Sequence, residues 1–187
     1  EIIADSGYTP YTYEENGNAT GIYVDIMNEV FAKLDGYKVT INALPWKRGL
    51  ELLKTGKRLG ILPPYKKIKQ RPYLNPYSEP IYQEQVVVYC RQSVITQKKR
   101  PNWPDDYHGL SIGTNMGFLL GGDAFSQAVK NGKIEKVEAR NTEIALKKLI
   151  AGRTDCYVHS KVGILWVLEK LRKTGFLQQY DNDPIGV

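Results

Sequence analysis

Strand-like and helix-like segments alternate along most of this chain, and this alternation limits the folds open to it. Runs of β-branched and apolar residues, typical of strands, lie at residues 1–5, 37–44, 59–63, 110–115, 133–139 and 154–159. Apolar residues with the spacing of an amphipathic helix lie at residues 22–34, 46–56, 121–132, 141–152 and 160–175. The order favours parallel βαβ units over a helical bundle or a β-sandwich.

Local signals refine this reading. Asn16-Gly17 predicts a hairpin turn within the turn-rich connector 7–21. In residues 141–152, Asn141 or Thr142 can cap the start of a helix and Gly152 can end it. Three helices show apolar faces: Val24, Met27, Val30, Phe31 and Leu34 share one face of the first, and we expect Phe125, Ala128 and Val129, and Ile164, Leu165, Leu168 and Leu171, to face inward in two others.

The two halves of the chain repeat one plan. "LELLKTGKRLGIL" and "ALKKLIAGRTDCYV" both read as a leucine-rich helix, a glycine, a basic residue and a strand. We therefore expect two α/β lobes, residues 1–84 and 85–187, with a crossover strand at about residues 82–92. The chain enters its first strand almost directly at Glu1, so we expect that a leader was removed or the chain was trimmed.

Composition excludes several classes of function. The chain has 187 residues and a net charge of +6, but its basic residues are scattered, which argues against a nucleic-acid-binding protein. No apolar run approaches the roughly 18 residues of a membrane span. The two cysteines, Cys90 and Cys156, are far apart, which argues against zinc and leaves a disulfide or two buried thiols open. We expect no metal and no cofactor.

A set of motifs in fixed order resembles one protein family. The motifs are Y-x-P-Y-x-Y-x-x-x-G-x-x-x-G-x-x-V-D-I at residues 8–26, "LPWKRGLELLKTGK", an arginine ahead of "YSEPIY", "LSIGTNMG" and "ALKKLIAGRTDCYV". Together they resemble the family 3 extracellular solute-binding proteins of the amino-acid-binding type. The resemblance implies a two-lobed flytrap of the type II periplasmic-binding-protein fold, each lobe a mostly parallel sheet flanked by helices, with a ligand in the cleft between lobes.

The resemblance also assigns roles to individual residues. Arg71 falls on the family arginine that clamps the ligand carboxylate, as the planar guanidinium fork allows. Asp5 falls where some members place a carboxylate toward a cationic ligand. The resemblance places four aromatic residues around the ligand: Tyr8, Tyr11, Trp46 and Tyr65. It places Gly117, Phe118 and Leu119 on a loop of lobe 2, where free backbone N–H groups favour an anion.

Three positions depart from the family pattern. Lys66 and Leu119 stand where relatives have Ser or Thr, and His159 stands where relatives have the acidic residue that takes the ligand ammonium. A neutral imidazole accepts one hydrogen bond, and a charged one repels an ammonium. These departures lean toward a more anionic or non-amino organic acid as ligand.

Each of these residues also has a plainer interpretation. Without the resemblance, the aromatics read as core or rim residues, Arg71 as a surface arginine and Lys66 as part of a solvated face. His159 equally fits a satisfied histidine at a strand end. Relatives continue beyond a strand like residues 184–187 back into lobe 1, so we expect that this return segment is missing here and that lobe 1 is under-covered.

Three functions compete at this point. The favoured one is a monomeric periplasmic or secreted protein that binds a small solute and delivers it to a membrane permease without chemistry. The second is a ligand-sensing domain that regulates a membrane-bound signalling partner. The third is a dehydratase of cyclic amino-acid precursors on the same scaffold. The sequence shows no nucleophile–base pair and only two histidines, His108 and His159, so we expect that the protein is not an enzyme.

Overall fold

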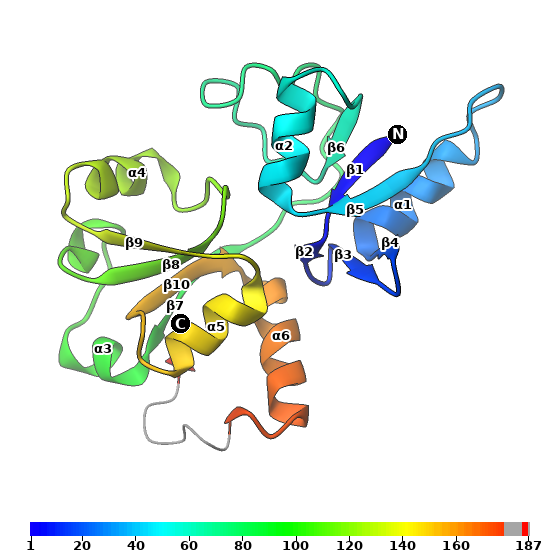
Figure 1. Ribbon diagram of the computed structural model, residues 1–187. Coiled ribbons are helices and arrows are strands. Elements are labelled where there is room, and N and C mark those ends of the chain that lie inside the picture. Colours follow the sequence, from blue (N-terminus) through cyan, green and yellow to red (C-terminus); the bar gives the residue numbers. More distant parts are fainter. Residues whose placement is uncertain (178–184, 187) are drawn as a thin grey trace. The chain divides into compact units, whose positions relative to one another are not determined.

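A computed structural model describes residues 1–177 and 185–186 of the chain (Figure 1). The chain divides into two compact units, unit 1 (Glu1–Gln83) and unit 2 (Glu84–Val187). Each is an α/β unit with its own sheet, so the predicted fold class is confirmed. Within the described residues, no helix combines the length and apolar character needed to cross a membrane.

A parallel sheet of three strands underlies unit 1 (Figure 1). In the spatial order β5-β1-β6, its strands are β1 (Ile2–Asp5), β5 (Ile41–Leu44) and β6 (Gly60–Leu62). Helix α2 (Trp46–Lys54) packs against β1 and β6. Gly49 allows this approach, because a Cβ atom there would lie 2.8 Å from Cγ2 of Ile3 and 2.9 Å from Cδ1 of Ile61.

A small antiparallel sheet follows β1 in unit 1. Its strands are β2 (Gly7–Tyr8), β3 (Thr12–Glu15) and β4 (Asn18–Thr20). The predicted hairpin turn is confirmed, since Asn16 and Gly17 connect β3 to β4 with φ values of 52° and 81°. Two successive residues with positive φ match the twist of the flanking strands.

Helix α1 (Ile22–Phe31) contacts β3 and β4. Its N-cap, Gly21, has a φ of 113°, and a Cβ atom there would lie 2.6 Å from the carbonyl oxygen of Tyr11. The apolar face assigned from the sequence is only partly covered: Val24 is buried, whereas Val30 is 46% exposed. The small sheet covers the side of α1 that carries Tyr23 and Val24 and leaves the opposite side open.

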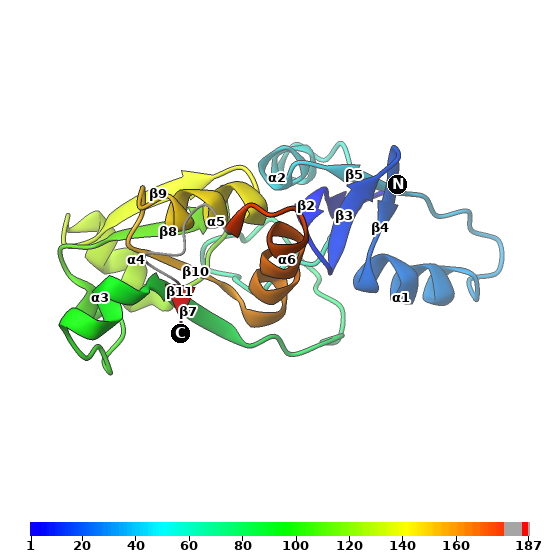
Figure 2. The same cartoon turned by 90° about the horizontal axis from the view of Figure 1, so that it is seen from below.

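A mixed sheet of five strands underlies unit 2 (Figure 2). In the spatial order β11-β7-β10-β8-β9, its strands are β11 (Ile185–Gly186), β7 (Val86–Arg91), β10 (Cys156–Ser160), β8 (Ser111–Asn115) and β9 (Glu135–Ala139). β8 pairs parallel with β9 and β10, and β7 pairs antiparallel with β10 and β11. Of the strand expected at residues 184–187, Pro184 and Val187 lie outside the described residues.

The helices of unit 2 are α3 (Gln92–Gln97), α4 (Gly122–Lys130), α5 (Thr142–Ile150) and α6 (Lys161–Lys173), with a short 3₁₀ helix η1 (Asp105–Tyr107). The N-cap of α5 is Asn141, whose Oδ1 accepts a hydrogen bond from the backbone N–H of Ile144 at 3.0 Å. The sequence did not predict α3, because its β-branched residues extend the strand pattern of β7.

Helices α5 and α6 lie side by side and enclose the main core with β10 and β7 (Figures 1 and 2). Ile164 and Leu171 of α6 are buried in this core, and Leu168 packs against it, as predicted. The prediction was wrong for Leu165, which is 46% exposed. Leu165 follows Ile164 directly, and one residue turns the side chain by about 100° around a helix, so the two side chains do not share a face.

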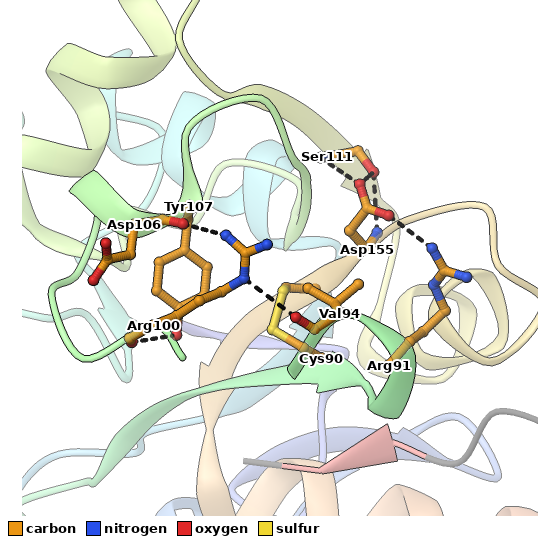
Figure 3. Close-up of a disulfide and its surroundings, with 9 residues drawn as sticks. Cys90, Arg91, Val94, Arg100, Asp106, Tyr107, Ser111 and Asp155 are labelled. Atoms are coloured by element: carbon orange, nitrogen blue, oxygen red, sulfur yellow. Dashed lines mark hydrogen bonds and ion pairs between the residues drawn. A yellow bond between two sulfur atoms is a disulfide. The ribbon is translucent and has the colours of Figure 1, made fainter. Parts of the chain in front are cut away.

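A disulfide joins β7 to β10 between Cys90 and Cys156 (Figure 3). These residues are directly opposite each other in the antiparallel register. Of the two alternatives left open by the sequence, the disulfide is therefore the one that the structure contains. Both cysteines are buried.

Asp155 ties three strands together beside the disulfide (Figure 3). Its Oδ2 accepts hydrogen bonds from the backbone N–H and the hydroxyl of Ser111, each at 2.8 Å, and its Oδ1 pairs with Nη2 of Arg91 at 2.8 Å. Partial burial alone would raise the pKa of the carboxyl, but these donors outweigh it and lower the pKa below its ordinary value. The folded protein therefore favours the charged carboxylate form of Asp155.

We expect Asp155→Ala to destabilise unit 2 by about 2–3 kcal/mol, because it leaves Ser111 and Arg91 without this acceptor. Urea unfolding at neutral pH with the disulfide intact measures the change. Asp35→Ala is the control: Asp35 is exposed in a turn of unit 1, and its replacement should change the free energy of unfolding by less than about 0.5 kcal/mol. Equal stability of the two variants would contradict the role given to Asp155.

Candidate functional site

Parallel pairing brings three segments of unit 1 to one edge of its sheet. Asp5 ends β1 and lies opposite Leu44, the last residue of β5, while Ala4 lies opposite Leu62, the last residue of β6. The segments that leave this edge carry Trp46 and Tyr65. Ligands of open α/β sheets bind outside the carboxyl ends of the strands, and this edge is therefore the candidate site in unit 1.

Aromatic rings form one part of this site. The hydroxyls of Tyr8 and Tyr65 lie 3.4 Å apart, and the rings of Tyr8 and Tyr11 lie 4.8 Å apart between centroids. Tyr11 also stacks on Tyr23 at 5.5 Å and meets the ring of Tyr82 at 6.3 Å. Tyr8 and Tyr11 are each only 1% exposed, which makes them the fixed floor of the cluster.

The guanidinium of Arg71 lies over the indole ring of Trp46, with Cζ 5.6 Å from the ring centroid. Arg71 is 6% exposed and Trp46 is 7% exposed. Burial lowers the pKa of Arg71 below its ordinary value, and the nearby phenols Tyr73 and Tyr77 act in the opposite direction. A desolvated guanidinium in this setting interacts far more strongly with a carboxylate than an exposed one does.

Asp5 is the acidic group at the same sheet edge. It is 5% exposed, and its Oδ1 accepts a hydrogen bond from the backbone N–H of Gly7 at 3.0 Å. Burial raises the pKa of its carboxyl from 3.8 to about 7, although the hydrogen bond from Gly7 acts in the opposite direction. Asp5 therefore changes its charge close to neutral pH, and a cationic group of a ligand would favour the charged form.

Lys66 follows Tyr65 directly in the chain and is exposed to solvent. The side chain is consistent with the solvated face that was the plainer interpretation of the lysine cluster. The turn that holds Arg71 begins one residue later, where Lys67 O accepts hydrogen bonds from the N–H groups of Gln70 and Arg71. The structure thus separates Lys66, on the outside, from Arg71, on the inside.

In unit 2, the candidate loop residues Gly117, Phe118 and Leu119 connect β8 to α4, and all three are half-buried. The N–H of Phe118 donates to Asn115 O at 3.0 Å. Gly117 has a φ of 78°, in the region that favours glycine. The ring of Phe118 lies 5.6 Å from that of His159, so two of the predicted unit 2 residues are neighbours.

His159 is fully buried on β10 and belongs to a polar network. Its Nε2 lies 2.9 Å from Oγ1 of Thr142, which also accepts a hydrogen bond from Nδ2 of Asn115 at 3.2 Å. The hydroxyl of Tyr157 donates to Oδ1 of Asn115 at 2.8 Å. Burial lowers the pKa of the imidazole from 6.5 to about 3, so the ring is neutral at physiological pH.

The sequence as a whole identifies the family. Residues 1–150 match the profile of the bacterial extracellular solute-binding proteins, family 3. The chain belongs to this family. A curated relative, the probable amino-acid-binding protein YxeM of Bacillus subtilis, is 24% identical over 181 residues, which are 94% of this chain and 63% of that protein. The chain thus spans less than two-thirds of the length of this relative.

Solved structures share the fold at low sequence identity. One structure comes from work on glutathione import in Gram-positive bacteria via GshT and the cystine ABC importer TcyBC of Streptococcus mutans. It superposes with a TM-score of 0.74 at 20% identity, and the match covers 99% of this chain and 74% of that one. A histidine kinase sensor domain similar to periplasmic binding proteins gives 0.71 at 18% identity, over 92% and 72%. The same fold therefore occurs in a protein of an import system and in a sensor domain.

Sequence reasoning missed the residues that support the site rather than line it. Tyr23 and Tyr82 extend the aromatic cluster through Tyr11, and Thr142 and Asn115 hold His159. Thr142 carried a signal, since it starts a helix, but that signal predicted only a helix cap. No sequence pattern pairs residues that meet through the fold from distant elements.

The pKa of Asp5 leads to a testable dependence of stability on pH. Unfolded Asp5 loses its proton near pH 3.8, but folded Asp5 keeps it up to about pH 7. Its contribution to stability is therefore complete below pH 3.8 and is lost as the pH rises to about 7. Over this range the free energy of unfolding should fall by roughly 3–5 kcal/mol more in the wild type than in Asp5→Asn, measured by urea unfolding at a series of pH values.

Asp25→Asn is the matched control, because Asp25 is exposed in the first turn of α1 of the same unit. This variant should keep the pH dependence of the wild type. An Asp5→Asn variant with an unchanged pH profile would show that the carboxyl of Asp5 titrates normally in the fold.

Proposed function

We propose that this family 3 protein binds a small polar solute that carries a carboxylate, an amino acid or a related organic acid, and delivers it to an ABC-type permease. The observation that carries the proposal is the buried guanidinium of Arg71, which is held over Trp46 beside the carboxyl-end edge of the unit 1 sheet. A guanidinium offers two parallel N–H donors that match a carboxylate. The half-buried Tyr65, whose hydroxyl lies 3.4 Å from that of the buried Tyr8, supplies apolar surface for the rest of the solute.

The setting of the protein is proposed to be extracytoplasmic, either periplasmic or secreted. The family consists of extracellular proteins, and the disulfide between Cys90 and Cys156 is typical of an oxidising compartment. Delivery to a permease is supported by the relatives: YxeM is a probable amino-acid-binding protein, and the structurally similar Streptococcus mutans system includes an ABC importer. We propose that the protein acts as a monomer and releases its solute unchanged.

A sensory role is the second candidate, because the fold also matches a histidine kinase sensor domain. In that role the same solute site would regulate a membrane-bound signalling partner instead of supplying a permease. The complete coding sequence distinguishes the two roles. A gene that continues into a membrane span and a kinase domain favours the sensor, and a gene that lies beside permease genes favours the transporter.

Substitution of Arg71 tests the proposed carboxylate contact. Arg71→Ala should lower the affinity for a carboxylated ligand by about 2–5 kcal/mol, and Arg71→Lys, which keeps the charge without the planar fork, should recover only part of it. Isothermal titration calorimetry with amino acids, among them L-arginine and L-glutamine, and with organic acids that lack an α-ammonium group measures the affinities. Mass spectrometry of the same samples should recover each solute unchanged.

Arg48→Ala is the control for this experiment. Arg48 lies two residues after Trp46 in α2, and it is exposed. Its loss changes the net charge as Arg71→Ala does but leaves the buried cation in place, so the affinity should stay at the wild-type value. Arg71→Ala with wild-type affinity would remove Arg71 from the site.

His159 offers a test of ligand class. A neutral imidazole accepts one hydrogen bond at most, whereas the acidic residue found here in relatives accepts several and attracts an ammonium. We therefore propose that His159 disfavours ordinary α-amino acids. His159→Asp should bind them about 10-fold more tightly or better, seen as a larger rise in melting temperature on addition of each amino acid.

The other histidine of the chain provides the control. His108 is exposed in the segment after η1, and His108→Asp should respond to amino acids as the wild type does. The rise in melting temperature is compared with each variant's own ligand-free value, which removes any change in basal stability. If His159→Asp gains nothing, the position does not select against the ammonium group.

A further inference from the structure

The loop that carries Gly117, Phe118 and Leu119 is fixed firmly where it leaves β8. The N–H of Met116 donates to Ala139 O of β9 at 2.8 Å, and the N–H of Phe118 donates to Asn115 O at 3.0 Å. Both bonds extend the backbone order of the sheet into the first residues of the loop. The far end of the loop leads into helix α4 instead of a strand.

Two successive glycines form that far end, immediately before and at the first residue of α4. Gly121 has a φ of 88° and Gly122 a φ of 85°. Both values lie in the left-handed region, and glycine reaches this region as readily as any other. Two glycines in a row therefore leave the backbone at Gly121 and Gly122 with several accessible conformations. A contact from another part of unit 2 is needed to select one of them.

Trp103 supplies this contact. Its indole Nε1–H donates to the carbonyl oxygen of Gly121 at 2.8 Å. Its ring stacks on Phe125 of α4 at 5.1 Å between centroids, with an angle of 25° between the planes. The two rings also occupy the space beside Gly121, where a Cβ atom would lie 2.7 Å from Phe125 and 3.2 Å from Trp103.

Trp103 is itself held by the segment between α3 and β8. The ring of Tyr107 meets the indole edge-on at 4.9 Å, and the guanidinium of Arg100 lies 5.7 Å from the centre of the Tyr107 ring. Arg100 donates to the carbonyl oxygens of Asp106 and Val94, as Figure 3 shows next to the disulfide. A continuous set of contacts thus runs from the disulfide-linked strand β7 through α3 to Gly121.

We propose that Trp103 is a positioning residue of the solute site. By holding the Gly121 carbonyl, it selects one backbone conformation for the end of the loop that carries Gly117, Phe118 and Leu119, and so fixes the shape that this loop presents to the solute. This inference rests on the proposed function and on the place of Gly117, Phe118 and Leu119 among the candidate site residues. Trp103 acts through the loop backbone and has no direct contact with the solute in this account.

Trp103→Phe separates positioning from packing, because phenylalanine keeps an aromatic ring against Phe125 but lacks the N–H donor. Loss of this hydrogen bond should weaken binding about 5- to 10-fold, measured by calorimetry with L-arginine, L-glutamine and organic acids that lack an α-ammonium group, such as succinate, as probes. Hydrogen exchange of the ligand-free protein should become faster at residues 116–122 and stay unchanged in α5 and α6. Trp166→Phe is the control, since Trp166 is 51% exposed on α6 of the same unit.

Each outcome decides the matter. Weaker binding with faster exchange confined to residues 116–122 supports the proposal. Wild-type affinity in Trp103→Phe overturns it while leaving the proposed function intact, and faster exchange throughout unit 2 overturns it in favour of a general packing role. If the wild type binds none of the probes, the proposed function fails for them, and unchanged exchange in Trp103→Phe then overturns the positioning role independently.

Discussion

The parallel pairing of β1 with both of its neighbours is the constraint on which unit 1 depends. Parallel strands run in one direction, so the chain must leave β1, β5 and β6 at the same edge of the sheet. Three short strands thereby bring Asp5, Trp46 and Tyr65 together, although these residues are far apart in the sequence. Ile3 and Ala4 are both fully buried, one on each face of the central strand β1, and they anchor this strand within unit 1.

Unit 2 achieves similar order by different means. Its sheet is mixed, and the central strand β10 is joined to β7 by a disulfide and to β8 through Asp155 and Ser111. These links lie at the start of β10, while His159 lies near its end. One end of the strand therefore carries covalent and ionic contacts, and the other carries the neutral polar network of His159 and Thr142. Stability and the proposed selectivity are thus properties of opposite ends of a single strand.

The sequence predicted most of this architecture because its signals are local. The Asn16-Gly17 turn, the Asn141 cap and the alternation of strands and helices each depend on a few neighbouring residues. The exposure of Leu165 and Val30 could not be predicted in this way, because it depends on which sides of α6 and α1 the rest of the fold covers. The site residues came from the family resemblance, and the sequence could not show that Arg71 is buried over Trp46 whereas Lys66 is exposed. Contacts between distant segments, such as Trp103 with Gly121, have no local signature.

Native mass spectrometry of the protein purified from its own host addresses the central claim most directly. Solute-binding proteins with buried, desolvated recognition groups hold their ligands tightly, so a small carboxylated solute should remain bound through purification. The account predicts an added mass that disappears on unfolding and is identified as a carboxylic acid. A spectrum of the bare polypeptide alone, unchanged after addition of amino acids and organic acids, would contradict it.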